Sequence, residues 1–272
     1  MTHDAPAPVS GDPLPAAVAV LVAVNVLNNR VARRLAPVTS ALAAGTLVVL
    51  ARRSGLSLAQ MGFQDGRGGV KLGGALAGAV AAVYACGVLL PSTRRFFRDE
   101  RALGLSRARL AEEVLVQVPL GTVLLEEVAF RGVLPAVLRR SYGAGVAVAG
   151  SSALFGLWHI LPALDMAAAN PALSGLADAG SRTDGTVAGS RGNGEGAGGS
   201  AAARLVAGSV VSTGLAGVFF HELRRRGGLT APSLFHLATN SLGFLAARSA
   251  RRLDRLSGRS PQPVGTTWKP SA

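Results

Sequence analysis

The sequence predicts an all-α protein, a polytopic bundle of transmembrane helices, and three observations point to this class. The chain has 272 residues, of which 49% are hydrophobic and only 16% are charged. Its mean hydropathy is +0.37, which is too apolar for an ordinary soluble domain of this length. Long apolar runs recur along the chain, and short basic clusters separate them. This alternation is typical of an integral membrane protein.

The strongly basic composition also fits a membrane protein. The formal charge is +13, because 28 Lys and Arg residues oppose only 15 Asp and Glu residues. In a soluble protein such a balance would indicate a nucleic-acid partner. Here the basic residues gather between apolar runs, as in Arg30, Arg33 and Arg34, where anionic lipid headgroups and the positive-inside rule favour them. We therefore expect membrane lipid, and no nucleic acid, as a partner, and the oligomeric state stays open.

We predict about seven spans, with an interfacial amphipathic helix as an eighth element. The basic segment 92–113 contains scattered Leu and Phe, which indicates the interfacial helix. The predicted spans cover residues 14–29, 35–51, 70–90, 114–138, 143–164, 205–222 and 229–247. Basic residues divide roughly two to one between the two sides of this topology, which favours an outer N-terminus and an inner C-terminus.

Three further segments carry no predicted span. Residues 1–13 form a flexible tail without Lys or Arg, so the first apolar run does not follow the basic region of a cleavable signal peptide and is expected to be retained. Residues 167–202 are rich in Gly, Ala and Ser and predict a flexible insertion. Residues 248–272 are basic, then rich in Pro, Gly and Ser, and predict a disordered tail.

Two adjacent glutamates, Glu126 and Glu127, lie near the middle of the predicted span 114–138. Ionisable groups at that depth are costly unless they face a cavity or each other, so they indicate a functional site. Glu127 and Arg131 are four residues apart and can form an ion pair on one helical face. Glu126 projects about 100° away and is free to meet another helix. This pattern favours a chemical role for Glu126, whereas Glu127 and Arg131 could equally be a structural brace.

Two other spans also carry polar side chains. Phe155 and His159 are four residues apart in one span, and His236 and Asn240 are four apart in another. Either histidine alone could be satisfied by a neighbouring carbonyl. Because each group otherwise lacks a partner in the bilayer, convergence on one polar pocket is the economical hypothesis.

These residues resemble the three signature motifs of a known family. In chain order they are EEVAFRG at 126–132, Phe155-x-x-x-His159 and His236-x-x-x-Asn240. It is the CAAX protease and bacteriocin-processing enzyme family (CPBP, or Abi), which includes the type II CAAX prenyl endopeptidases. The similarity covers roughly residues 110–247. It makes residues 111–247 a predicted catalytic core that follows the N-terminal spans and interfacial helix of residues 14–110. The long insertion 167–202 is the main departure from the family pattern.

The resemblance implies intramembrane peptide hydrolysis in a bacterial-type cell membrane. It implies that Glu126 with His159 activates a water and that His236 with Asn240 stabilises the oxyanion. Glu127 and Arg131 would organise the site, with Phe155 as a further supporting residue. The substrate would be a membrane-associated, and in some cases lipidated, peptide or protein. Whether it is prenylated stays open.

A zinc-dependent reaction is the alternative chemistry, with Glu126, His159 and His236 as ligands, because two His and a Glu form a known catalytic ligand set. No His-Glu-x-x-His sequence places two ligands on one helix, since His221-Glu222 is followed by Leu-Arg-Arg. A cofactor-free, glutamate-type protease is therefore the favoured interpretation. A transporter with a proton relay and a non-catalytic immunity or scaffold protein on the same fold are the rival functions.

Overall fold

The computed structural model describes residues 11–64, 66–97, 99–169 and 195–258 of the chain. Throughout this part of the chain the regular structure is helical, which confirms the all-α prediction. The α-helices are α1 (Leu14–Val26), α2 (Ala36–Arg53), α3 (Gly66–Leu89), α4 (Glu100–Gly104), α5 (Arg107–Glu112), α6 (Leu124–Glu127), α7 (Leu134–Trp158), α8 (Ile160–Ala169), α10 (Glu195–Gly227) and α11 (Thr230–Leu256). The π-helical stretches are η1 (Leu27–Val31), η4 (Glu113–Val123) and η5 (Val128–Val133), and the 3-10 turns are η2 (Arg33–Leu35) and η3 (Arg94–Phe97).

Five stretches of the described residues are long and apolar enough to cross a membrane, so the predicted count of seven separate spans is not reproduced. One of them, Arg107–Ala167, holds the predicted fourth and fifth spans. They are separated by a bend at Gly143, whose φ of 86° is a conformation that other residues rarely adopt. The predicted seventh span lies on α11, which falls outside the five. We attribute this to its polar residues, among them His236 and Asn240.

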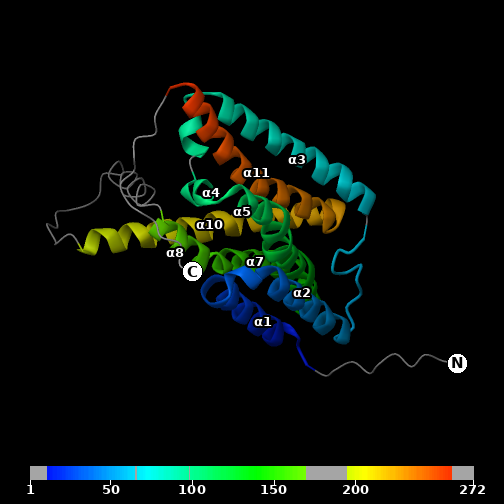
Figure 1. The fold of residues 1–272 in the computed structure, drawn as a ribbon. Coiled ribbons are helices and arrows are strands. Elements are labelled where there is room, and N and C mark those ends of the chain that lie inside the picture. Colours follow the sequence, from blue (N-terminus) through cyan, green and yellow to red (C-terminus); the bar gives the residue numbers. More distant parts are fainter. Residues whose placement is uncertain (1–10, 65, 98, 170–194, 259–272) are drawn as a thin grey trace, which may run out of the picture.

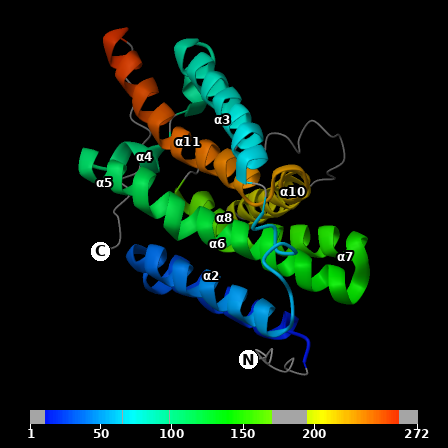
Figure 2. The ribbon, with the colours of Figure 1, turned by 90° about the vertical axis from the view of Figure 1, so that its right-hand side faces the viewer.

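The helices lie in three layers (Figures 1 and 2). α3 and α11 pack side by side in one outer layer, where Tyr84 Oη donates a hydrogen bond to the Thr239 carbonyl at 3.1 Å. The middle layer contains the helix that runs from α5 through α6 into α7, with α10 packed against α7. α1 and α2 form the other outer layer. The helix that carries the glutamates is therefore covered from both sides.

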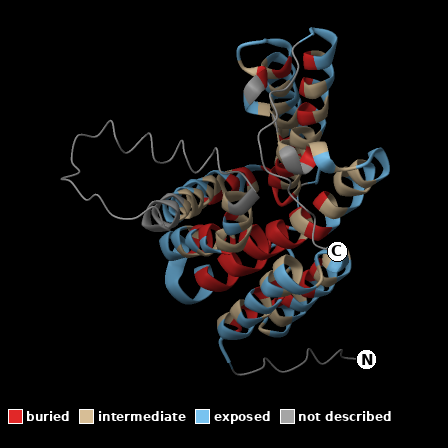
Figure 3. Cartoon of the chain, turned by 60° about the vertical axis from the view of Figure 1, so that its left-hand side comes forward, coloured by how far each residue is buried: buried red, intermediate tan, exposed pale blue. Residues whose placement is uncertain are grey.

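The middle layer holds most of the buried residues (Figure 3). The hydrophobic core, which the middle layer shares with α1 and α2, includes Leu47 of α2, Leu125 of α6 and Val137 of α7, all fully buried. Large apolar side chains such as Leu42 and Val83 are exposed on the outer layers. In a membrane these outward-facing side chains contact lipid, so the buried core and the exposed surface are both apolar.

The prediction of one continuous interfacial helix over residues 92–113 is wrong. The chain there forms η3, α4 and the beginning of the helix that continues from α5. The break before α5 occurs at Ser106, whose extended backbone and side-chain hydrogen bond to the Arg109 amide form an N-cap. Arg94 also turns back, donating hydrogen bonds to the Val88 and Leu89 carbonyls.

The predicted disordered tail is wrong for its first nine residues, because α11 continues to Leu256. Arg94 and Asp254 form a buried ion pair at 3.3 Å, and Arg248 donates a hydrogen bond to the Ala102 carbonyl. These contacts hold a strongly charged helix against η3 and α4. Residues 259–272 and residues 1–10 of the predicted N-terminal tail lie outside the described residues.

The predicted Gly-rich insertion 167–202 is described only at its two ends. Residues 167–169 belong to α8, and residues 195–202 form the first part of α10, so both ends are helical rather than irregular. Residues 170–194, which make up most of the predicted insertion, lie outside the described residues.

The close contact between α7 and α10 generates a stability prediction at Gly156. A Cβ atom at this position would lie 2.5 Å from the Val210 carbonyl oxygen of α10. Gly156→Ala should therefore force the helices apart and lower the free energy of unfolding by about 1–3 kcal/mol, the usual cost of overpacking. Thermal denaturation of the purified protein in detergent measures this change.

Gly208→Ala on α10 is the matched control, because a Cβ there meets nothing within 4 Å. It should leave stability unchanged or raise it slightly through higher helix propensity. Equal melting temperatures for Gly156→Ala and the wild type would contradict this close packing.

Candidate active site

The candidate active site is built on the continuous helix that α5, η4, α6, η5 and the first part of α7 form. Two of its stretches, η4 and η5, are π-helical and flank the short α6. Pro119, which has no amide proton to donate, lies within η4. π-helical turns widen a helix and are frequent at functional sites. Glu126 and Glu127 occupy the last two positions of α6, and both are buried.

Glu127 contacts two basic side chains. Its Oε2 atom lies 3.6 Å from Arg131 Nε, so the ion pair predicted from the spacing of four residues is present. Its Oε1 atom lies 2.7 Å from His236 Nδ1, across the interface with α11. A carboxylate only accepts hydrogen bonds, so His236 Nδ1 carries a proton in this contact when Glu127 is ionised. Glu127 thereby sets the orientation of the imidazole ring.

Arg131 is almost completely buried, with 1% of its side chain exposed. Its guanidinium carbon lies 3.8 Å from the ring centre of Phe155 and 4.3 Å from that of Phe220. None of its three side-chain nitrogens has a hydrogen-bond partner among the described residues. The two aromatic faces and Glu127 therefore stabilise its charge, and a desolvated cation–π contact is worth about 2 kcal/mol.

Glu126 contacts side chains of two other elements, α7 and α11. Its Oε1 atom accepts a hydrogen bond from Trp158 Nε1 at 2.9 Å. Its Oε2 atom lies 3.7 Å from His236 Nε2 and has no hydrogen-bond partner among the described residues. His236 therefore lies between the two glutamates, with one ring nitrogen facing each.

Among the described residues, no hydrogen bond or ion pair joins His159 or Asn240 to the glutamates. His159 follows α7, and its Nδ1 atom lies 2.8 Å from the Phe155 carbonyl oxygen, with its ring packed on the Phe155 ring at 4.6 Å. Asn240 lies one turn after His236 on α11, is half-buried and has no hydrogen-bond partner in the described part of the chain. Of the predicted residues, Glu126, Glu127, Arg131, Phe155 and His236 thus form one connected cluster.

Three residues that the sequence did not single out as part of the site also contribute. Trp158 binds Glu126, and Phe220 stacks on Arg131 and contacts the His236 ring at 5.1 Å. Asn25 of α1 donates a hydrogen bond to the Trp158 carbonyl at 3.1 Å. The sequence could have indicated a role for Asn25, because it is a polar residue within the first apolar run. It gave no such indication for Phe220, because Phe is common in apolar spans.

The donors of the alternative zinc site do not come together. Among the described residues no three His, Cys, Asp or Glu side chains form a group that could hold a metal ion. Glu126 and His236 are neighbours, but His159 is engaged with the Phe155 backbone instead. The proposed ligand set of Glu126, His159 and His236 therefore does not fit a zinc ion in this arrangement, and no step of the reaction is assigned to a metal.

Comparison with known proteins identifies the region that holds this cluster. Residues 113–242 match the model of the family described as type II CAAX prenyl endopeptidase Rce1-like. The match begins where η4 begins and includes every predicted site residue from Glu126 to Asn240. No curated protein and no solved structure matches the chain. Residues 113–242 are therefore a domain of the Rce1-like family of type II CAAX prenyl endopeptidases, which implies a CAAX-type membrane endopeptidase.

Proposed function

We propose that the protein hydrolyses peptide bonds of membrane-associated substrates, lipidated ones included, with Glu126 as the general base. The observation that carries this proposal is the buried arrangement in which His236 lies between Glu126 and Glu127. Peptide hydrolysis without a serine or cysteine nucleophile needs a base for water and donors for the oxyanion. The cluster offers a carboxylate oxygen, Glu126 Oε2, with no hydrogen bond among the described residues.

In the proposed reaction, the water hydrogen-bonds to Glu126 Oε2 and transfers a proton to it as its oxygen attacks the substrate carbonyl. The tetrahedral intermediate then collapses, and the proton passes from Glu126 to the leaving amine nitrogen. The products are a new carboxylate and a free amine. Trp158 holds the other oxygen of Glu126, which keeps the carboxylate in a fixed orientation during both transfers.

His236 and Asn240 are the proposed donors for the oxyanion. Glu127 fixes the His236 ring through Nδ1, so Nε2 is the nitrogen directed toward Glu126 and the reacting groups. Because Glu127 already accepts the Nδ1 proton, His236 donates to the oxyanion from Nε2 as the imidazolium, with a proton on each ring nitrogen. The Asn240 amide is free to donate, since it has no hydrogen-bond partner in the described structure. His159 donates Nδ1–H to the Phe155 carbonyl, because a carbonyl oxygen only accepts. In the neutral ring its Nε2 atom is then an acceptor, which suits a role beside the water.

The position of the cluster supports a membrane-associated substrate. Glu126 lies within the Arg107–Ala167 stretch, roughly midway between Arg107 and the bend at Gly143. A soluble peptide would have to bring backbone groups into hydrocarbon, where each unsatisfied group costs several kcal/mol. A lipid-modified peptide or the end of a transmembrane segment already lies at that depth.

Loss of the proposed base tests the mechanism. Glu126→Gln should reduce proteolysis on the order of 10²–10⁴-fold, the usual contribution of a positioned acid–base group, with the protein still folded in the membrane. Hydrolysis is measured with purified enzyme and a membrane-anchored peptide. Glu222→Gln, which changes a partly exposed glutamate at the end of α10, is the matched control and should keep full activity. An active Glu126→Gln enzyme would remove Glu126 from the role of base.

Charge balance at Glu127 and Arg131 predicts a non-additive effect on stability. Glu127→Gln or Arg131→Gln alone leaves a buried charge without its partner and should cost roughly 3–5 kcal/mol. The double variant removes both charges and should cost clearly less than the sum of the two single effects. Melting temperatures of the three variants give the comparison, and strict additivity would show that the two side chains do not interact.

Chelation tests the glutamate-type proposal directly. Strong chelators should leave the activity of the purified enzyme intact, and elemental analysis should find no stoichiometric zinc. If activity is lost on chelation and returns with zinc, the metal alternative with Glu126, His159 and His236 as ligands replaces the proposal.

Substrate form provides the last test of this function. The enzyme should cleave a lipid-modified or transmembrane peptide and leave its soluble, unmodified counterpart almost uncut, because only the former reaches the buried cluster without exposing backbone groups to hydrocarbon. Membrane peptidomes of cells with wild type and with Glu126→Gln would identify the natural substrate. Equal turnover of soluble and anchored peptides would contradict an intramembrane site.

A further inference from the structure

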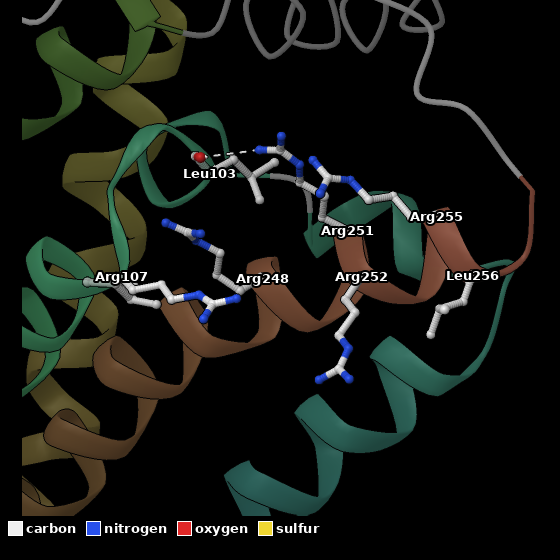
Figure 4. Close-up of a pocket in the computed structure, with 8 residues that line it drawn as sticks. Leu103, Arg107, Arg248, Arg251, Arg252, Arg255 and Leu256 are labelled. Atoms are coloured by element: carbon white, nitrogen blue, oxygen red, sulfur yellow. Dashed lines mark hydrogen bonds between the residues drawn. The ribbon is translucent and has the colours of Figure 1, made fainter.

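A strongly basic cavity of about 890 Å³ lies away from the glutamate cluster, at the end of α11. Five arginines and three leucines line it: Arg107, Arg248, Arg251, Arg252, Arg255, Leu103, Leu110 and Leu256. Figure 4 shows the arginines around the cavity, with Arg252 directed away from Arg251 and Arg255. The lining therefore combines positive charge with apolar surface and contains no acidic residue.

Two of these arginines are held in place by neutral groups. Arg248 donates hydrogen bonds to the Ala102 and Leu105 carbonyls, and Arg251 donates one to the Leu103 carbonyl at 3.2 Å (Figure 4). Carbonyl oxygens orient a guanidinium group but do not neutralise its charge. Both side chains are half-buried, so they are positioned before any ligand arrives.

The remaining three arginines are exposed and have no partner among the described residues: Arg107, Arg252 and Arg255. No carboxylate in the described part of the chain forms an ion pair with any of the five. Asp254, in the same turn of α11, is buried against Arg94 instead. Five positive charges around one cavity repel one another, and an anion bound there relieves this repulsion.

We propose that this cavity binds the phosphodiester group of an anionic phospholipid. Guanidinium groups bind phosphate oxygens with paired hydrogen bonds, so an arginine cluster is well suited to a phosphodiester. Leu103, Leu110 and Leu256 provide apolar surface for the glycerol and the first acyl carbons. The cavity also lies where α5 begins and α11 ends, at one end of the bundle, where headgroups of a bilayer are found.

The bound headgroup would connect the two helices that form the glutamate–histidine contact. Arg107 begins the helix that continues to Glu126 and Glu127, and Arg248 to Arg255 follow His236 on α11. A phosphodiester that binds both arginine sets therefore stabilises the pairing of these helices. The expected consequence is a higher melting temperature in membranes that contain the anionic lipid.

The test compares three conditions with the full-length protein in nanodiscs. They are phosphatidylcholine alone, phosphatidylcholine with a minor fraction of phosphatidylglycerol, and phosphatidylcholine with inorganic phosphate in the buffer. Phosphatidylglycerol should raise the melting temperature, and native mass spectrometry should detect one retained anionic lipid. Phosphate alone should give neither result.

The decisive variant is the pair Arg107→Gln and Arg255→Gln. Both side chains are exposed and have no partner among the residues that the structure describes. The fold should therefore be unaffected, while retention of phosphatidylglycerol weakens on the order of tenfold or more. Arg53→Gln with Arg67→Gln removes the same charge from exposed positions at the end of α2 and the beginning of α3, and should retain the lipid as wild type does.

Two results would overturn the proposal. Equal loss of lipid in both double variants would show a general effect of net charge rather than a site. An equal stabilisation by inorganic phosphate would assign the cavity to a soluble anion instead of a lipid. Peptidase activity is a separate readout, so failure of the lipid site leaves the assignment of Glu126 untouched.

Discussion

The packing of the bundle depends on how the buried carboxylate of Glu127 is paired with other side chains. An isolated carboxylate is very costly to bury, and Glu127 is buried between Arg131 and His236. Arg131 in turn requires the aromatic faces of Phe155 and Phe220, since Glu127 is too far away to accept a hydrogen bond from it. The partners of Glu127 thus come from η5 and α11, and those of Arg131 from α7 and α10, so satisfying both charges fixes how these helices pack around α6.

Much of this cluster could be predicted from the sequence, because spacing along a helix determines direction. The interval of four residues between Glu127 and Arg131 places both on one face, and adjacent glutamates necessarily diverge. The order of three polar motifs on three apolar runs indicated one shared site. The partner of each side chain was less predictable. The resemblance implied that Glu126 works with His159. In the structure Glu126 lies beside His236, and His159 binds a backbone carbonyl at the end of α7.

The fold class was equally evident, but element boundaries were predicted less well, because tertiary contacts override local composition. Residues 248–256 carry four arginines and look like a soluble tail, yet Arg248, Arg251 and Asp254 find partners on η3 and α4. Backbone carbonyl groups at the end of α4 accept the hydrogen bonds of Arg248 and Arg251, and the composition of a segment does not indicate such acceptors. Similarly, Phe220 stabilises Arg131 from α10, a helix that holds none of the three motifs.

Asn25 and Ser40 show that the structure supporting the site extends beyond the segment that matches the family model. Family similarity ends at Leu242, within α11, and excludes α1, α2 and α3. Yet Asn25 holds the carbonyl of Trp158, and Ser40 donates a hydrogen bond to the Gly121 carbonyl at 2.6 Å. The side chains of the cluster are therefore supported by helices outside the matched segment. A fragment trimmed to residues 113–242 would retain the reactive side chains but lose part of the structure that holds them.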